Sequence, residues 1–257
     1  MHIAVILRIV PDLSEDLDID ETGTDIDREW VGLALNEFDD HALEEAVLIK
    51  EAGGARVTAV AFAGDGAERQ LQSAIARGAD DALLIEHDIE GAINSRMAAH
   101  LLAGALPELG ATVVLTGVQS SEDVYGQLAP YLAGLLDCPT LNAVNGIFVD
   151  GDTLMVTQEY SGGHSAEFAV SGTAVLGVQT ASKPLRYVSG SKLREAAGTT
   201  IAKASGSLPF DIVNTTTEAL KKPERSASAE MIPGDASAVA QKIVAILMER
   251  GLLGVKA

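Results

Sequence analysis

The sequence predicts an α/β fold: a Rossmann-like, doubly wound, mostly parallel sheet, an antiparallel β meander, and a C-terminal arm that ends in a helix. Near-continuous apolar runs alternate with amphipathic helical runs through the first two-thirds of the 257 residues. Asp-Gly and Gly-Gly turn signals flank short β-rich runs at about 140–170. After about residue 182 the periodicity fades, and it returns only in a final helical stripe.

The first strand is expected at residues 3–10, which read IAVILRIV. A helix should follow, with Asp39 or Asp40 as its N-cap and Gly53 as its end. Its apolar face comprises Ala42, Leu43, Ala46 and Val47. Further parallel strands are expected at 56–62, 82–87, 111–117 and 174–180, with helices at about 66–78 and 93–106.

Two regions follow from this pattern: an α/β domain over 1–182 that contains the meander, and an arm over 183–257. Asp235 can cap a terminal helix that ends at Gly251. Its apolar stripe comprises Val239, Ile243, Ile246 and Leu247. Such a stripe needs a cover, which is either the protein's own core or a partner subunit.

Composition narrows the function classes. The chain has 18 Lys and Arg against 37 Asp and Glu, a formal charge of -19, so nucleic acid is not an expected partner. No apolar run approaches the roughly 20 residues that span a bilayer. The N-terminus reads as a strand rather than a leader. A single cysteine, Cys138, fits a reducing cytoplasm.

The segment 117–127 carries the main candidate site. It follows an apolar strand and supplies amides and hydroxyls but no lysine, histidine or cysteine. Ligands of doubly wound sheets lie beyond the carboxyl ends of strands, and a helix expected to begin near Val124 would point its N–H groups at a phosphate. This composition suits binding of a ribose or phosphate, or an ordinary polar loop with a helix cap.

Other candidate motifs are weaker. Gly64 and Gly66 form half of a dinucleotide fingerprint. Residues 18–29 approach a calcium loop, but a strand rather than a helix precedes them, so we expect a solvated acidic loop. The histidines do not cluster at metal-ligand spacings. We therefore expect neither a metal site nor catalytic residues, and favour a binding module.

Three stretches resemble the β subunit of electron-transfer flavoproteins. LNEFDDHALEEAVLIKE (35–51) resembles that family's Asn-x-Phe/Trp-Asp segment and helix. Residues 57–86 resemble its strand, loop and Ala-x-x-x-Gly-Ala-Asp element, and residues 115–139 its nucleotide loop in the Gly-Val-Gln-Ser-Ser form of one bacterial branch. With the meander and terminal helix, the resemblance covers nearly the whole chain.

The resemblance implies an α/β heterodimer, with one redox-active FAD shared with and held mostly by the α subunit. The β subunit would bind a second nucleotide, usually a structural AMP, or a second FAD in a bifurcating branch. The dimer would carry electrons from a flavin-containing dehydrogenase to a quinone reductase or other acceptor, without itself being an enzyme. A non-redox adenine-nucleotide-binding module remains an alternative. The terminal arm and helix would pack on the α subunit.

Carried over by position, the resemblance implies nucleotide contacts from four places along the chain. Ile6 and Phe62 would enclose an adenine, and Asn36 would read its edge or satisfy nearby backbone. The complete set is Ile6, Asn36, Glu37, Phe38, Asp39, Phe62, Gly117, Val118, Gln119, Ser120, Ser121, Glu122, Asp123, Val124, Tyr125, Gly126, Gln127 and Leu128.

Two departures from the family pattern bear on ligand and partner. Leu128-Ala129 replaces a Thr-Gly that many AMP-binding relatives have, and QLAP partly matches the Gln-x-Gly-Pro of bifurcating relatives. AMP and FAD both stay open, with Gly-Val-Gln-Ser-Ser favouring AMP. The dehydrogenase-recognition loop keeps Pro184, Arg186 and Tyr187, but Gly190 stands near the expected anchor leucine, which Leu193 could replace.

Overall fold

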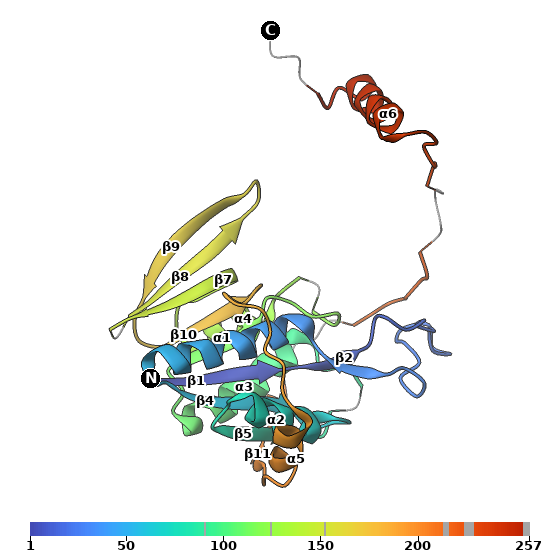
Figure 1. The fold of residues 1–257 in the computed structure, drawn as a ribbon. Coiled ribbons are helices and arrows are strands. Elements are labelled where there is room, and N and C mark those ends of the chain that lie inside the picture. Colours follow the sequence, from blue (N-terminus) through green and yellow to red (C-terminus); the bar gives the residue numbers. More distant parts are fainter. Residues whose placement is uncertain (90, 124, 152, 213–215, 224–228, 254–257) are drawn as a thin grey trace. The chain divides into compact units, whose positions relative to one another are not determined.

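The computed structural model describes residues 1–89, 91–123, 125–151, 153–212, 216–223 and 229–253. The chain divides into two compact units, Met1–Glu218 and Ala219–Ala257. In the first unit, eleven strands and five helices are described (Figure 1). The strands are β1 His2–Leu7, β2 Ile9–Pro11, β3 Leu33–Leu35, β4 Arg56–Phe62, β5 Asp81–Glu86, β6 Val113–Gly117, β7 Thr140–Asp150, β8 Thr153–Tyr160, β9 His164–Val170, β10 Ala174–Val178 and β11 Ala202–Ser205. The helices are α1 Glu37–Gly53, α2 Ala67–Arg77, α3 Ser95–Leu109, α4 Leu128–Leu136 and α5 Gly190–Ala196.

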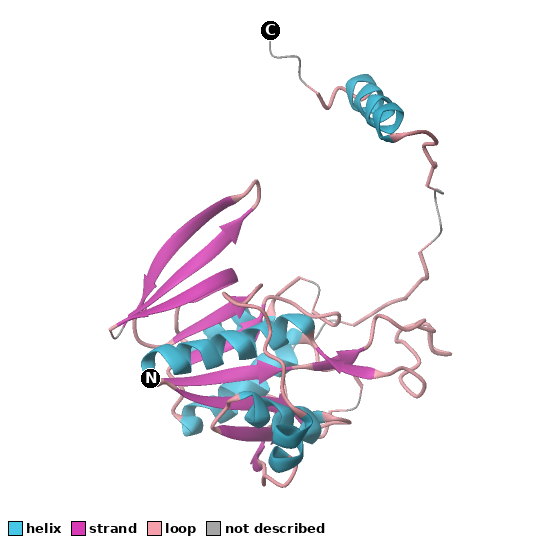
Figure 2. Cartoon of the chain, in the orientation of Figure 1, coloured by secondary structure: helices cyan, strands magenta, loops and turns pink. Residues whose placement is uncertain are grey.

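Nine strands form one sheet in the order β11-β5-β4-β1-β6-β10-β7-β8-β9. Pairing is parallel from β11 through β7 and antiparallel between β7, β8 and β9. The predicted doubly wound sheet with a β meander is therefore confirmed. Figure 2 shows the meander strands extending away from the helix-covered part of the sheet.

Two helical layers bury the parallel strands. Ile3, Val5 and Leu7 of β1 face the side that α1 and α2 cover, whereas Ala4 and Ile6 face α3 and α4. Alternate residues of a strand point to opposite faces. Because helices cover both faces of the sheet, all five side chains are fully buried. Burial on both faces explains why the strands read as continuous apolar runs rather than as alternating ones.

The strand order reverses at β1, which pairs with β4 on one side and with β6 on the other. The chain winds outward through β4 and β5, and α3 then carries it back to β6. The loops that leave β1 and β6 therefore diverge at this point, and their separation opens a crevice at the carboxyl ends of the strands.

A buried ion pair joins the elements at this switch point. The Asp39 carboxylate, on α1, accepts hydrogen bonds from Arg8 Nε at 2.9 Å, Arg8 Nη2 at 2.8 Å and the Arg8 backbone N–H at 2.8 Å. It also accepts the Gly117 N–H at 2.6 Å. A side chain at Gly117 would collide with Asp39 and Phe38, so only glycine allows this approach. Strands β1 and β6 and helix α1 thereby meet at one carboxylate.

Several predicted boundaries were wrong, for physical reasons. Helix α1 begins at Glu37 after Asn36, which makes no side-chain cap, and Asp39 turns to Arg8 instead of capping the helix. The predicted end at Gly53 is confirmed, and Gly54, in the left-handed region, caps the helix with its N–H on the Lys50 carbonyl. Helix α4 begins at Leu128 and not near Val124, which lies outside the described residues.

The region after residue 182 contains two elements that the sequence did not predict. Helix α5 packs on α2, and β11 pairs in parallel with β5 at the edge of the sheet. Both are short, seven and four residues, so neither produces a periodic signal long enough to read.

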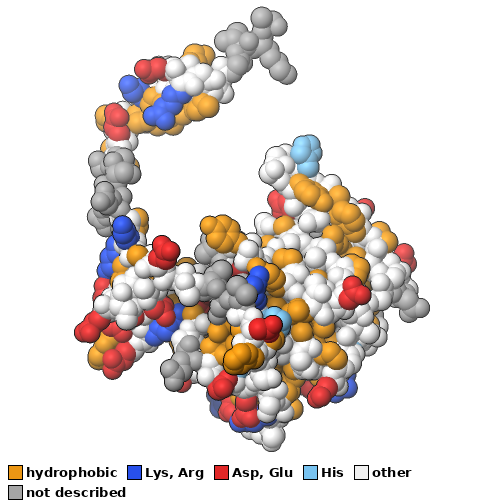
Figure 3. All heavy atoms as spheres, turned by 180° about the vertical axis from the view of Figure 1, so that it is seen from behind, with side chains coloured by type: hydrophobic (Ala, Val, Ile, Leu, Met, Phe, Trp, Pro, Cys, Tyr) orange, Lys and Arg blue, Asp and Glu red, His pale blue; other side chains and the backbone are white. Residues whose placement is uncertain are grey.

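The second unit contains helix α6, Ala236–Glu249, whose Asp235 side chain accepts the Ala238 N–H at 2.9 Å. The predicted cap is confirmed, and Gly251 follows just after the helix, in the left-handed region. No described residue of α6 is buried. Figure 3 shows hydrophobic side chains along this helix, at the upper left.

Replacing Asp39 with Ala should lower the free energy of unfolding by about 3–5 kcal/mol, because it leaves the Arg8 guanidinium buried without its carboxylate. Urea denaturation of the full chain measures this loss. As a matched control, Asp81→Ala removes an exposed pair with Arg56 and should cost no more than about 1 kcal/mol. Equal small losses would contradict a central role for Asp39.

Stability should also fall as the pH drops below the ordinary histidine value of 6.5, in part through His2. Burial and the neighbouring Arg56 lower the pKa of His2, whose Nε2 lies 2.8 Å from Thr58 Oγ1. The unfolded chain then binds the proton more readily, so acid favours unfolding. His2→Gln should flatten the pH dependence of urea unfolding between about pH 6.5 and the lower pKa of His2, and an unchanged pH dependence would contradict this role.

Candidate functional site

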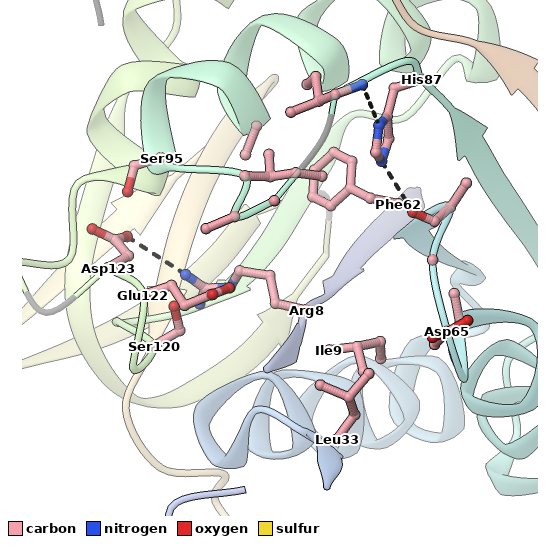
Figure 4. Close-up of a pocket in the computed structure, with 18 of the residues that line it drawn as sticks. Arg8, Ile9, Leu33, Phe62, Asp65, His87, Ser95, Ser120, Glu122 and Asp123 are labelled. Atoms are coloured by element: carbon pink, nitrogen blue, oxygen red, sulfur yellow. Dashed lines mark hydrogen bonds and ion pairs between the residues drawn. The ribbon is translucent and has the colours of Figure 1, made fainter. Parts of the chain in front are cut away.

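A cavity of about 340 Å³ lies at the carboxyl ends of β1, β4, β5 and β6. It begins at the switch point between β1 and β6 and continues past the end of β4 to the loop after β5. Its volume falls in the range of small-molecule sites. Figure 4 shows Phe62 and His87 on one side of the cavity and Ser120, Glu122 and Asp123 on the other.

The wall formed by β4 and β5 is mostly apolar. It includes Phe62, Ile89 and Ile93, together with Gly64 in the turn before α2. The His87 ring joins the two strands at this wall: its Nε2 lies 3.0 Å from the Ala63 carbonyl, and its Nδ1 accepts the Ile89 N–H at 3.2 Å. A planar aromatic group could pack here against Phe62.

The opposite wall is formed by the loop between β6 and α4. Asp123 closes this loop by accepting the N–H groups of Gln127 at 2.9 Å and Leu128 at 3.1 Å. Gly126 lies in the left-handed region, where its close approach to the Val118 carbonyl leaves no room for a side chain. The first turn of α4 thus receives a carboxylate from its own loop, which explains why the helix begins four residues later than predicted.

The loop also holds a buried hydroxyl without a partner. Ser120 is 4% exposed and lines the cavity, and its Oγ has no hydrogen-bond partner among the described residues. The neighbouring Ser121 Oγ is also buried and unpaired in the described part of the chain, but Ser121 is not part of the cavity wall. Buried polar groups normally find partners, so an unpaired hydroxyl on a cavity wall is typical of a ligand-binding surface.

Charges of both signs surround the cavity. Arg8 and Arg28 line it together with Asp65, Glu122 and Asp123. Burial alone would lower the pKa of Arg8, but Asp39 and Asp123 outweigh it and raise that pKa above its ordinary value. Arg8 is therefore a permanent cation whose donors are directed at Asp39, Asp123 and the carbonyls of Gly117 and Gln119.

The structure places the residues named by the family resemblance in three groups. On the cavity wall are Phe62, Ser120, Glu122, Asp123 and Leu128. Ile6 lies behind the wall, where it packs in the core toward α3 and α4. A further group lies around the loop and is not part of the cavity wall: Asn36, Phe38, Asp39, Gly117, Val118, Gln119, Ser121 and Gly126. Exposed are Glu37, Tyr125 and Gln127, and Val124 is not described.

Sequence reasoning missed several residues of the site. Arg8 is the only charged residue in the run IAVILRIV, and that isolation was the available signal. Arg28 and His87 carried no such signal, because they come from an acidic loop and from the end of an ordinary strand. Their contribution depends on contacts across the chain, such as the 2.5 Å bond from Arg28 Nη2 to Glu122 Oε1.

The segment named as a recognition loop lies against α1 and α2. Arg186 Nε donates to Glu44 at 3.0 Å and Nη1 to Glu51 at 2.8 Å. The hydrogen bonds that Arg186 donates to Glu51 and Glu44 raise its pKa above the ordinary value. Tyr187 is 92% exposed and Leu193, on α5, is 40% exposed. Pro184 is exposed as well.

Among the described residues, no helix is long and apolar enough to cross a membrane. The same residues contain no group of three or more histidine, cysteine, aspartate or glutamate side chains placed to hold a metal ion.

Comparison with known proteins identifies the family. Residues 24–206 match the model of the electron transfer flavoprotein domain. The chain is 31% identical to the electron transfer flavoprotein subunit beta of Clostridium acetobutylicum, over 75% of this chain and 74% of that protein. It is 30% identical to the subunit beta of Methylophilus methylotrophus (80% and 79%). It is 29% identical to the acryloyl-CoA reductase electron transfer subunit gamma of Anaerotignum propionicum (64% and 62%). The fold, the switch-point cavity and these matches together show that the chain belongs to the family of electron transfer flavoprotein β subunits.

Proposed function

We propose that this chain is the β subunit of a heterodimeric electron-transfer flavoprotein and that its switch-point cavity binds AMP as a structural nucleotide. The observation that carries the proposal is the buried, unpaired hydroxyl of Ser120 on the wall of a 340 Å³ cavity. A ribose or phosphate oxygen would satisfy that hydroxyl, and Phe62 offers an aromatic face to a base.

The residues present suit binding better than chemical transformation. Arg8 is held by Asp39, Asp123 is engaged by the α4 N–H groups, and His87 is bonded through both ring nitrogens. The described cavity lining contains no serine or cysteine next to a free base, which nucleophilic catalysis would need. The redox step would belong to an FAD shared with the α subunit, which supplies the flavin chemistry when bound.

A second FAD in the place of AMP is the other candidate, and the apolar extension of the cavity is the observation that supports it. The cavity does not stop at the switch point but extends past β4 to Ile89 and Ile93 beyond β5. This apolar extension could receive a group larger than adenosine. A dimer of that kind would hold two flavins and could bifurcate electrons.

Two surfaces suit the proposed partners. On helix α6, Ile243, Val244 and Met248 are 44%, 42% and 57% exposed, and no described residue of this helix is buried. We assign these three exposed side chains to a contact with the α subunit, because an uncovered apolar helix face needs a partner. Tyr187 and Leu193 would contact the dehydrogenase, while Arg186 holds their segment on α1.

The nucleotide inventory of the purified heterodimer tests the proposal. Coexpression with the α subunit, release of cofactors by heat and chromatography should give one FAD and one AMP per dimer. Two FAD per dimer would support the two-flavin alternative. A dimer that holds one FAD and no nucleotide in the β subunit would overturn both.

Ser120→Ala should affect the ligand-bound and ligand-free chain in opposite directions. It removes a hydrogen bond to the ligand, which should weaken AMP binding by about 2- to 10-fold in calorimetry. It also removes an unsatisfied buried hydroxyl, so the free energy of unfolding without ligand should stay the same or rise. Ser121→Ala, which also deletes an unpaired hydroxyl but outside the cavity wall, should change AMP affinity less than about twofold. Equal effects of the two variants would contradict this role for Ser120.

A further inference from the structure

The first turn of α4, where the sequence placed a phosphate, already receives a charged group. The Asp123 carboxylate accepts the Gln127 and Leu128 N–H groups at 2.9 and 3.1 Å. It also lies 3.5 Å from Arg8 Nη1. A ligand phosphate at this position would have to displace a carboxylate that three donors hold. The anionic end of the ligand therefore needs another cation.

Arg8 does not meet that need, although it lines the cavity. Its Nε and Nη2 are bonded to Asp39, and Nη2 also donates to the Gly117 and Gln119 carbonyls at 3.1 Å each. Its Nη1 faces Asp123. Each guanidinium nitrogen of Arg8 is thus engaged with the protein, and its side chain is only 10% exposed.

Arg28 is the other cation on the described part of the cavity wall. Its Nε and Nη2 bond to Asp25 at 3.0 and 3.2 Å, and Nη2 donates to Glu122 at 2.5 Å. These contacts leave Nη1 without an acceptor among the described residues. The Arg28 side chain is 32% exposed and that of Glu122 is 21% exposed, so the pair lies where the cavity reaches solvent.

We propose that Arg28 binds the phosphate of the nucleotide and that Glu122 occupies the guanidinium only while the cavity is empty. This inference rests on the proposed function, since it requires an adenine nucleotide in the cavity. A guanidinium binds phosphate through parallel N–H donors, and Nη1 and Nη2 of Arg28 provide such a pair once Glu122 is released. Glu122 then turns to solvent, which removes a like charge from the neighbourhood of the phosphate.

If phosphate replaces Glu122 on the guanidinium, substitutions of Arg28 and of Glu122 should change the affinity for AMP in opposite directions. Loss of the cation in Arg28→Gln should weaken AMP binding, whereas loss of the competing carboxylate in Glu122→Gln should strengthen it. Neither change should alter the affinity for adenosine by much, because adenosine has no phosphate to meet the guanidinium. A purely structural role of the pair would instead weaken both ligands in both variants.

The test is calorimetry of AMP and of adenosine with the full-length chain, freed of endogenous nucleotide. Arg28→Gln should raise the Kd for AMP about tenfold and leave that for adenosine within about twofold. Glu122→Gln should lower the Kd for AMP severalfold, and Arg28→Lys should recover part of the affinity that Arg28→Gln loses. Arg56→Gln, which removes an exposed cation paired with Asp81 at the opposite end of β4, is the matched control and should change neither ligand.

The outcomes separate this inference from the proposed function. Suppose that the wild-type chain binds AMP, but that Arg28→Gln weakens the binding of AMP and of adenosine equally, or weakens the binding of neither. The proposed role of Arg28 would then be wrong, while the proposed nucleotide site would stand. Weaker AMP binding in Glu122→Gln would also overturn the exchange. If the wild-type chain binds neither ligand, the proposed nucleotide site itself is wrong.

Discussion

The Asp39 carboxylate is the interaction on which the rest of the site depends. It joins the end of β1, through Arg8, to the end of β6, through the Gly117 N–H, and it extends from the first turn of α1. Three elements that diverge at the switch point of the sheet are thereby held at one place. A buried ion pair contributes little to stability compared with apolar packing, but its hydrogen-bond geometry fixes where the two loops begin. The crevice between those loops is the cavity.

Helix α1 extends this role along its length. Asp39, near its first turn, fixes the cavity, and the Glu45 carboxylate receives the N–H groups of Ile147 in the meander and of Ser182 after β10. Glu44 and Glu51 hold Arg186. One face of the helix thus packs on the sheet while its carboxylates anchor the site, the meander and the exposed segment before α5. Four acidic residues of α1 are therefore structural connections rather than part of a diffuse surface charge.

Most charged groups on the described cavity wall are already engaged within the protein. Arg8 is paired with Asp39 and faces Asp123, which accepts two backbone N–H groups at the start of α4, and His87 joins two strands. What remains available is a hydroxyl, an aromatic face and one guanidinium near solvent. These described groups suit the nucleotide that we propose for the cavity of this member of the electron transfer flavoprotein β-subunit family.

The sequence was enough to predict the sheet, the meander, most helices and the family, because each depends on periodicity or on motifs within a few tens of residues. It also located Phe62 and the 117–128 loop. The folded structure was needed to show that Arg8 pairs with Asp39, 31 positions away, and that Arg28 pairs with Glu122, 94 positions away. It likewise decided that Asp123 caps α4, that Ile6 belongs to the core, and that β11 joins β5. The local pattern of apolar residues indicates which face of a helix or strand is buried. The partner of a buried charge depends instead on which strand ends lie close together in the fold. A single sequence does not directly record which distant segments are neighbours in space.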